Sequence, residues 1–457
     1  METNYKTYAS LCIIFMFLSS SFSDSNSIVK NLPGFHGDLP FTLETGYVGV
    51  GADDEIQLFY YFVESQRDPL HDPFLFYLTG GPGTSALYPF LFQMGPLSIN
   101  FDNSTWEKLT LELNPYSWAK TANVLFVDLP AGAGFSYATT YEATKSSDSI
   151  LAQHSYQFLI KWLEEHPRFL NNPLYITGIS YMGLIVPIVT LEVYKGNEHE
   201  DQPQLNIKGY LIISPLTDKF SDFNSKLEFA HRAALIPDDV YQLAKNTCDG
   251  NYIYNDPGNT ECSKSLQRMD ECTSRINEDN ILDPFCDEDN QDPVCGEVAA
   301  KYLKSFGNDK EVQKALHVRE GTIEEFEKTN ETIHYRFKKE DQNCYSYDIW
   351  SSIIYHKTLV SKKCQVLILS GDQDFTFPYV GAEQWIKSLN LPIESIWNPW
   401  FVNNHVAGYR MKYAKNGYSL TYATFKGAGH SIPLYKPEES WVILDEWLAS
   451  SSYLSDS

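Results

Sequence analysis

The chain has 457 residues, of which 43% are hydrophobic, 14% aromatic and 21% charged, a composition that supplies a large apolar core and excludes an intrinsically disordered protein. Its formal net charge of -24 repels phosphate backbones and anionic lipids, so no nucleic acid or membrane surface is expected as a partner. The length fits two or three average domains, or one α/β domain that carries an insertion.

Residues 1–23 are predicted to form a cleaved signal peptide. A lone Lys6 precedes an apolar run from Leu11 to Leu18, and the small residues Ser21 and Ser23 follow it. The run is too short to span a bilayer, and no later segment reaches about 18 unbroken apolar residues. We therefore expect a soluble protein of the secretory pathway.

Seven short β-rich segments alternate with helical patterns along the chain. The predicted strands are EIQLFYYFVE (55–64), DPFLFYLTGG (72–81), NVLFVDLP (123–130), NPLYITG (172–178), IKGYLIISP (207–215), CQVLILSG (364–371) and SLTYATFKGAGH (419–430). Residues 147–167 and 438–450 both carry apolar side chains at helical spacing. This alternation predicts an α/β fold with a mostly parallel central sheet covered by helices on both faces.

A glycine-rich loop, from Thr79 to Thr84, follows the second predicted strand. Its glycines would let the backbone approach a substrate closely, although a plain tight turn has the same composition. A reaction that develops negative charge on oxygen needs fixed N–H dipoles directed at it. We assign the backbone N–H groups of Gly81 and Tyr181 to such an oxyanion hole.

Residues 172–196 predict a strand, a turn that carries Ser180, and a helix, which is the plan of a nucleophile elbow. The spacing is unusual, because glycine stands at Gly183 and not at the position of Met182, as a G-x-S-x-G elbow requires. Taken alone, the pattern Gly178-x-Ser180-x-x-Gly183 is weak, and a buried structural serine explains it better.

The pattern changes between residues 216 and 355, where no strand is expected and charges and cysteines gather. Helical segments at 297–307 and 310–318 predict an inserted helical cap, which leaves 24–215 and 356–457 as the core. Seven cysteines follow Cys12, namely Cys248, Cys262, Cys272, Cys286, Cys295, Cys344 and Cys364. The crowding suggests disulfides, and the odd number leaves at least one thiol unpaired or intermolecular. A zinc site is the alternative, but the chain has no CxxC pair, so no metal is expected.

An acidic turn and a histidine follow the last two predicted strands. Either Asp372 or Asp374 could act as the acid, and His430 lies in a glycine-rich loop. Serine, acid and histidine, each after a strand, follow the chain order of an α/β-hydrolase triad. Two sequons, at Asn103 and Asn330, predict glycosylation.

Five motifs in order, LTGGPGTSAL, VDLPAGAGFSYA, TGISYMG, LSGDQDFTFP and KGAGHSIPLYKPEE, resemble the serine carboxypeptidase family, and more closely its plant serine carboxypeptidase-like acyltransferases. The resemblance runs from about residue 32 to residue 447. It implies the α/β-hydrolase fold with an inserted cap. It also implies a triad of Ser180, Asp374 and His430, with Gly81 and Tyr181 as the oxyanion donors.

The same resemblance implies that Cys248 pairs with Cys262 and that Cys286 pairs with Cys295. It leaves Cys272, Cys344 and Cys364 without an assignment. The glycine loop of the family ends in a cysteine that is bonded to the cap region, but this chain has Thr84 there. The expected partner position is Thr329, with Cys344 as a rival.

Thr79, Gly80 and Ile179 are expected to line the substrate site. The family's peptidases carry asparagine and glutamate at the positions of Thr79 and Ile179, where the two side chains bind the carboxylate of the peptide. An isoleucine cannot do this, and burying an under-paired carboxylate costs on the order of several kcal/mol. The acyltransferases carry threonine at the first position and usually aspartate at the second, so Ile179 departs from both branches.

The resemblance implies an acyltransferase that uses 1-O-β-acylglucose donors and alcohol or amine acceptors through a seryl acyl-enzyme, without a cofactor. It also implies a monomer or homodimer in the vacuole or outside the cell. A serine carboxypeptidase or esterase is the nearest alternative, because it differs only in what attacks the acyl-enzyme. A catalytically silent binding protein is a third possibility, and the intact triad argues against it.

Overall fold

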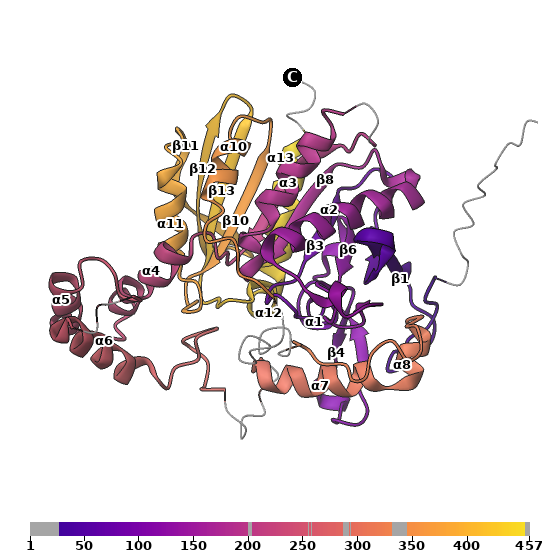
Figure 1. Ribbon diagram of the computed structural model, residues 1–457, viewed down its shortest axis with the longest axis horizontal. Helices are drawn as coiled ribbons and strands as arrows, with labels where there is room; N and C mark the ends of the chain where they lie inside the picture. The colour runs from indigo at the N-terminus through magenta and orange to yellow at the C-terminus, as the bar shows by residue number, and fades with distance from the viewer. Residues whose placement is uncertain are drawn as a thin grey trace, which may run out of the picture.

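The computed structural model describes residues 27–199, 203–254, 256, 258–286, 292, 294–330 and 345–452. The predicted signal peptide, including Cys12, and Cys344 lie outside these residues. The described part is built on an eleven-stranded sheet in the order β1-β2-β6-β3-β8-β9-β10-β13-β12-β11, with β7 paired to β2 (Figure 1). Its strands are β1 (Leu43–Val50), β2 (Ile56–Val63), β3 (Phe74–Leu78), β6 (Asn123–Val127), β7 (Tyr137–Ala138), β8 (Leu174–Ile179), β9 (Ile207–Ile213), β10 (Gln365–Gly371), β11 (Ile393–Val402), β12 (His405–Lys415) and β13 (Tyr418–Phe425). A small separate sheet pairs β4 (Leu97–Ile99) with β5 (Leu111–Leu113).

All seven predicted strands are present, as β2, β3, β6, β8, β9, β10 and β13. The six from β6 to β13 in sheet order run parallel, and antiparallel strands flank them on both sides. The hairpin of β11 and β12 was not predicted, because most of β11 is exposed and its sequence lacks regular alternation. The signal for it was Asn403-Asn404, two residues with positive φ that form the turn.

Helices cover both faces of the sheet, as predicted. They are α1 (Leu87–Phe92), α2 (Asp148–Glu165), α3 (Val186–Gly196), α4 (Lys219–Arg232), α5 (Asp238–Thr247), α6 (Thr260–Thr273), α7 (Gly296–Asn308), α8 (Lys310–Ala315), α10 (Ile353–Leu359), α11 (Tyr379–Ser388), α12 (Ile432–Tyr435) and α13 (Pro437–Ser452). Alternate strand residues feed two cores: Phe76 and Ile176 pack with α2, α3 and α11, whereas Leu75 and Tyr175 pack with α1 and α13. This arrangement is the α/β-hydrolase fold.

The predicted cap region holds α4 to α8. Helix α4 lies within the predicted cap, residues 216–355, but packs against the core helix α11. The boundary between core and cap at residue 216 therefore remains a prediction. Helices α5 and α6 extend from the body of the molecule at the lower left of Figure 1, and α7 and α8 lie along its lower edge. An apolar cluster that includes Val240 and Ala244 of α5 and Met269 of α6 packs the two helices together, and it continues into α4 and to Val380 of α11.

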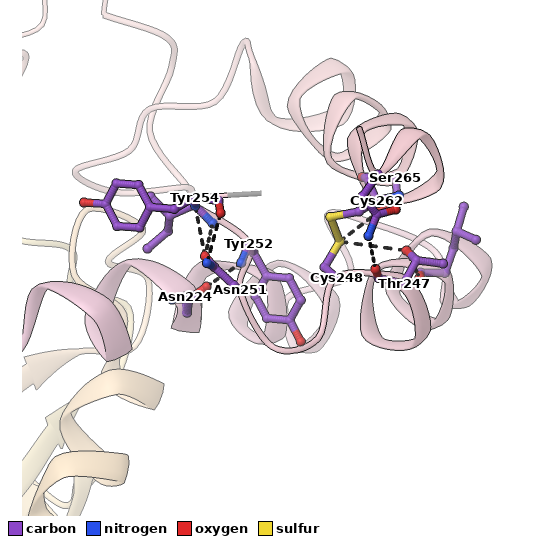
Figure 2. The surroundings of a disulfide bond; sticks show 11 residues. Asn224, Thr247, Cys248, Asn251, Tyr252, Tyr254, Cys262 and Ser265 are labelled. Carbon is purple, nitrogen blue, oxygen red and sulfur yellow. Dashed lines mark hydrogen bonds between the residues drawn. A yellow bond between two sulfur atoms is a disulfide. The ribbon is translucent and has the colours of Figure 1, made fainter. Parts of the chain in front are cut away.

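Both predicted disulfides are present, Cys248 with Cys262 and Cys286 with Cys295. The first joins the end of α5 to the start of α6 (Figure 2). Within the described residues Cys272 is an exposed free thiol and Cys364 a buried one.

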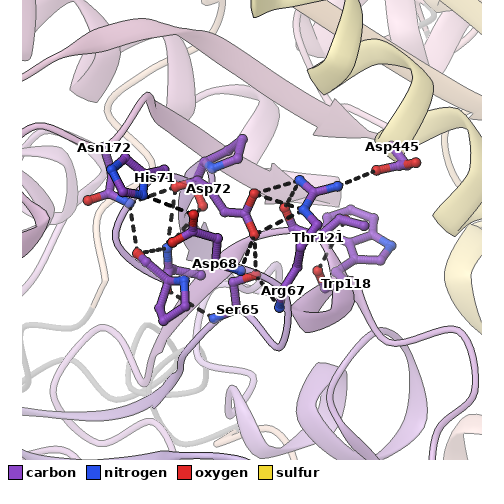
Figure 3. Close-up of polar contacts among 12 residues, drawn as sticks. Ser65, Arg67, Asp68, His71, Asp72, Trp118, Thr121, Asn172 and Asp445 are labelled. Carbon is purple, nitrogen blue, oxygen red and sulfur yellow. Dashed lines mark hydrogen bonds and ion pairs between the residues drawn. The ribbon is translucent and has the colours of Figure 1, made fainter.

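A polar network surrounds the buried Asp72 at the amino end of the sheet (Figure 3). The Asp72 carboxylate, just before β3, accepts hydrogen bonds from the Arg67 guanidinium at 2.6 and 2.9 Å, from the Ser65 hydroxyl at 2.5 Å and from the Asp68 amide at 3.0 Å. The Asn172 side chain, just before β8, donates to the Asp72 carbonyl at 2.7 Å. The network therefore fixes the starts of two neighbouring strands.

Candidate active site

The turn that carries Ser180, the predicted nucleophile, follows β8 directly; we refer to it as the nucleophile turn. Ser180 begins a short 3-10 helix, Ser180–Gly183, with φ of 62°, a left-handed conformation that is strained for a non-glycine residue. A Cβ at Gly183 would lie 2.4 Å from the Leu216 carbonyl oxygen, so the turn packs too tightly against the loop after β9 for any side chain there. This contact gives a physical reason for glycine at position 183.

The glycine-rich loop after β3 lies against the same turn. A Cβ at Gly80 would lie 2.8 Å from the Ser180 Cβ, so the loop backbone reaches the serine only because residue 80 is glycine. Among the hydrogen bonds of the described residues, the N–H groups of Gly81 and Tyr181 have no acceptor. Both donors are thus available for an oxyanion, as the predicted role requires.

The acid and the histidine are in contact. His430 Nδ1 donates to the Asp374 carboxylate at 2.9 Å, and the other Asp374 oxygen accepts from the Phe377 amide at 3.0 Å. Asp372 instead accepts from the Gly427 amide at 2.7 Å and serves as a turn former. Of the two candidate acids, the structure therefore brings Asp374 to the imidazole.

Burial and pairing set the charges of this pair. Burial raises the pKa of Asp374, and the neighbouring imidazole only partly offsets this. Burial alone would lower the pKa of His430, but the charge and hydrogen bond of Asp374 outweigh it and hold that pKa above its usual value. Asp374 therefore favours a proton on the ring, as a general base needs after it has accepted one.

Ser180 is partly exposed and sits at the carboxyl end of β8, two strands from β10 and three from β13, which carry the acid and the histidine. No hydrogen bond joins its hydroxyl to the His430 ring in the described part of the chain. Such catalytic hydrogen bonds often tighten only when substrate is bound. The contact between Ser180 and His430 in the triad therefore remains a prediction.

A cap segment that the sequence did not reveal clamps the acid and histidine loops together. The His430 amide donates to the Asp279 carbonyl at 2.6 Å, and the Phe375 amide donates to the Glu278 carbonyl at 2.9 Å. A Cβ at Gly429 would lie 2.0 Å from the Asp279 carbonyl oxygen. Because backbone carbonyls make these contacts, no residue pattern could have predicted them.

Two buried aspartates outside the triad organise the site. Asp128, directly after β6, accepts from the Ala86 amide at 2.6 Å and the Ser85 hydroxyl at 2.8 Å, and so fixes the end of the glycine-rich loop. Burial raises the pKa of Asp128 to about 7. The signal that could have found it is a carboxylate within the apolar run 123–130 that was predicted as a strand.

Asp148, the first residue of α2, accepts from the Tyr181 hydroxyl at 2.7 Å and from the Tyr345 hydroxyl at 2.8 Å. Its other oxygen accepts from the Ile349 amide at 2.8 Å. Asp148 therefore anchors the residue that follows the nucleophile to the chain segment that returns from the cap.

The glycine-rich loop contacts the cap at the two positions where the family is expected to have a disulfide and this chain has threonines. The hydroxyls of Thr84 and Thr329 lie 2.9 Å apart, and the two residues form an antiparallel bridge flanked by backbone hydrogen bonds of 2.8 and 3.1 Å. The predicted partner of Thr84 is thus confirmed as Thr329. Two hydroxyl groups make the link in place of two sulfur atoms.

The predicted substrate-site residues differ in their surroundings. Ile179 is 5% exposed and packs within an apolar core cluster. The Thr79 hydroxyl is buried and has no hydrogen-bond partner among the described residues. Asn103 is exposed, whereas the Asn330 side chain donates to the Gly132 carbonyl at 2.7 Å, and glycosylation of either remains a prediction.

The family model described as serine carboxypeptidase matches residues 33–450. Serine carboxypeptidase-like 2 of Arabidopsis thaliana is 42% identical over 96% of this chain and 96% of its own length, and Serine carboxypeptidase-like 1 of the same plant is 43% identical over 95% of each. Among solved structures, Kex1(delta)p, a prohormone-processing carboxypeptidase from Saccharomyces cerevisiae, is similar in fold with a TM-score of 0.71. It is 19% identical, with 92% of both chains covered.

Proposed function

The chain belongs to the serine carboxypeptidase family, and on that premise we propose that it is an acyltransferase, moving an acyl group from a 1-O-β-acylglucose to an alcohol or amine. The family is one of enzymes, and its scaffold is present here with a strained serine turn and a hydrogen-bonded aspartate–histidine pair.

In the proposed first half-reaction, His430 takes the proton of Ser180 as the serine oxygen attacks the ester carbonyl of the donor. The N–H groups of Gly81 and Tyr181 hold the oxyanion, and Asp374 stabilises the imidazolium. The carbonyl–glucose bond then breaks, and glucose leaves with the proton from His430. The acyl group remains on Ser180.

In the second half-reaction, His430 removes a proton from the acceptor, whose oxygen or nitrogen attacks the acyl-enzyme. Collapse releases the new ester or amide and returns the proton to Ser180. Water at high concentration competes for the same step, so transfer requires an acceptor held in line with the carbonyl. Effective molarities of about 10⁵ M or more make this competition favourable.

The observation that carries the proposal is the pair Thr79 and Ile179 beside the nucleophile. This pair cannot bind a peptide carboxylate as an asparagine and a glutamate would, because Ile179 has no polar atom and packs in an apolar cluster, which leaves only the Thr79 hydroxyl. Binding of a peptide terminus would leave its charge under-paired. A neutral acylglucose brings no such charge.

Incubation of the purified protein with a set of acylglucoses and a mixed acceptor extract tests the proposal. We expect new esters or amides by mass spectrometry, and a Ser180→Ala protein to form none. Free acid as the sole product would instead support an esterase.

Introducing the residues of the peptidases at positions 79 and 179 tests the observation on which the proposal depends. We expect a Thr79→Asn, Ile179→Glu double variant to gain carboxypeptidase activity on blocked dipeptides, with Ile179→Val as the matched control that gains none. If the wild-type protein already cleaves these dipeptides as fast as the double variant, the chain is a peptidase.

We also propose that the protein acts in the secretory pathway, in the vacuole or outside the cell. The two disulfides support this placement, because such bonds persist in oxidising compartments. None of the helices in the described ranges combines the length and apolarity needed to cross a bilayer.

A further inference from the structure

A lysine lies among aromatic rings next to the nucleophile turn. The Leu216 amide, just after β9, donates to the Ser180 carbonyl at 3.0 Å, and Lys219 follows three residues later as the first residue of α4. Its ammonium nitrogen lies 5.6 Å from the ring centroid of Tyr181, 5.3 Å from that of Tyr347 and 5.5 Å from that of Trp350. Cation–π attraction operates over such distances.

This ammonium has unused hydrogen-bond donors. The nearest carboxylate oxygen, on Asp148, is 3.9 Å away, and the Lys219 side chain is only 11% exposed. Asp148 is already held by two tyrosine hydroxyls and an amide. Within the described residues the ammonium donates no hydrogen bond, although it carries three N–H groups.

The neighbouring acidic groups have other partners. Asp218 accepts from the Ser221 amide at 2.8 Å as the cap of α4, and Asp348 accepts from the Ser149 amide at 3.1 Å. The donors of Lys219 are therefore available to a ligand oxygen.

The aromatic rings continue outward from the nucleophile turn and become more exposed. Tyr181 is 7% exposed, Tyr347 39% and Trp350 59%. Tyr254 follows at 58%, with its ring centroid 6.4 Å from that of Trp350; in Figure 2 its ring points away from the disulfide. Exposed apolar side chains that gather at one place on a surface mark binding sites, and flat rings favour stacking against another ring.

We propose that Lys219, Tyr347 and Trp350 form the binding subsite for an aromatic acceptor that carries a carboxylate. The ring stacks against the exposed aromatic side chains, and the carboxylate accepts hydrogen bonds from the Lys219 ammonium. This assignment rests on the proposed acyl transfer for its place in the reaction. The carboxyl carbon of the donor is already esterified to glucose, so the free carboxylate belongs to the acceptor.

A binding measurement on the Ser180→Ala protein tests the subsite separately from the chemistry, because this variant cannot form an acyl-enzyme by either transfer or hydrolysis. Benzoate and its neutral analogue benzamide are titrated by calorimetry and ligand-observed NMR. A charge-assisted hydrogen bond contributes about 1.5–3 kcal/mol, so we expect benzoate to bind at least about tenfold more tightly.

Variants then locate the effect. Lys219→Met keeps the length and packing of the side chain and is expected to abolish the preference for benzoate, while Lys219→Arg keeps it. Trp350→Ala is expected to weaken both ligands alike. Thermal unfolding of each variant shows that the fold is retained.

Three results would overturn the subsite: equal affinity for benzoate and benzamide, an unchanged preference in Lys219→Met, or no benzoate binding at about 10 mM. None of these would bear on acyl transfer, which the product assay tests separately. If esters form but only from uncharged acceptors, the transfer proposal stands and the subsite fails.

Discussion

The amino end and the carboxyl end of this sheet both bury aspartates, but they satisfy them differently. At the amino end, Asp72 accepts from a guanidinium, a hydroxyl and an amide, and these donors keep their protons at any ordinary pH. At the carboxyl end, Asp374 accepts from one amide and from the ring of His430, a group that can gain and lose a proton. The difference separates a carboxylate whose partners hold their protons from one whose partner can exchange a proton, as the predicted triad requires.

The two ends of the sheet also differ in backbone conformation. Ser180 is held in a left-handed conformation that costs of order 1–3 kcal/mol. Close approach of Gly80 on one side and of the Leu216 carbonyl on the other keeps the turn in place. The strained residue here is the predicted nucleophile, whereas the amino end is organised by hydrogen bonds and the ion pair of Arg67 with Asp72.

The largest expected effect comes from removing that oxygen. Ser180→Ala is expected to lower acyl transfer by about 10⁴-fold or more, because the acyl-enzyme can no longer form. A fluorophosphonate should phosphonylate Ser180 in the wild type and leave the variant unlabelled, as read by peptide mass spectrometry. Labelling of a different serine would show that Ser180, at the carboxyl end of the sheet, is not the nucleophile.

Asp374→Asn is expected to lower the maximal rate by about 10⁴-fold and also to change its pH dependence. His430 must be neutral to accept a proton, so the wild-type rate should rise with pH through a midpoint above 6.5. The variant lacks the charge of Asp374, so the lowering effect of burial on the pKa of His430 is opposed mainly by the weaker raising effect of Asp279. Its midpoint should therefore lie below that of the wild type, and an unmoved midpoint would mean that another group titrates.

Asp72→Ala tests the other end of the sheet. Removing a buried carboxylate leaves the Ser65 hydroxyl and the Asp68 amide unpaired, and we expect a loss of about 2–3 kcal/mol in the free energy of unfolding in urea. The half-exposed Arg67 returns to water and adds little. The rate of transfer at a permissive temperature should not change. A tenfold drop in kcat without loss of stability would show that the two ends are not separate.

The smallest effect is expected where the glycine-rich loop meets the cap. Thr84 and Thr329 oppose each other between two flanking backbone hydrogen bonds, a pairing that typically brings Cα atoms to about 4.5 Å. The Thr84→Cys, Thr329→Cys double variant is therefore expected to form a disulfide and to gain about 2 kcal/mol in stability. Each single variant serves as its control, and free thiols in the oxidised double variant would contradict this pairing.

The sequence predicted the parts of this molecule whose residues carry their own signals. Every strand of the parallel core is a β-rich run bounded by turn residues, and the order of Ser180, Asp374 and His430 after such strands predicted the candidate triad. The exposed strand β11 lacked that pattern. The clamp made by the Asp279 carbonyl could not be read, because any residue supplies a carbonyl. The rings around Lys219 come from two separate segments, one with Tyr181 and one with Tyr347 and Trp350, that only folding brings to the lysine.

The acyl-enzyme itself is the most direct test of the account. Wild-type protein is mixed with an acylglucose that it accepts, quenched in acid and digested, and the peptide that contains Ser180 is weighed by mass spectrometry. We predict that this peptide gains the mass of the acyl group, and that adding an alcohol or amine acceptor removes the adduct while an equal amount of new ester or amide appears. Product that forms with no adduct on Ser180 at any donor concentration, or an adduct that yields free acid alone whichever acceptor is added, would contradict it.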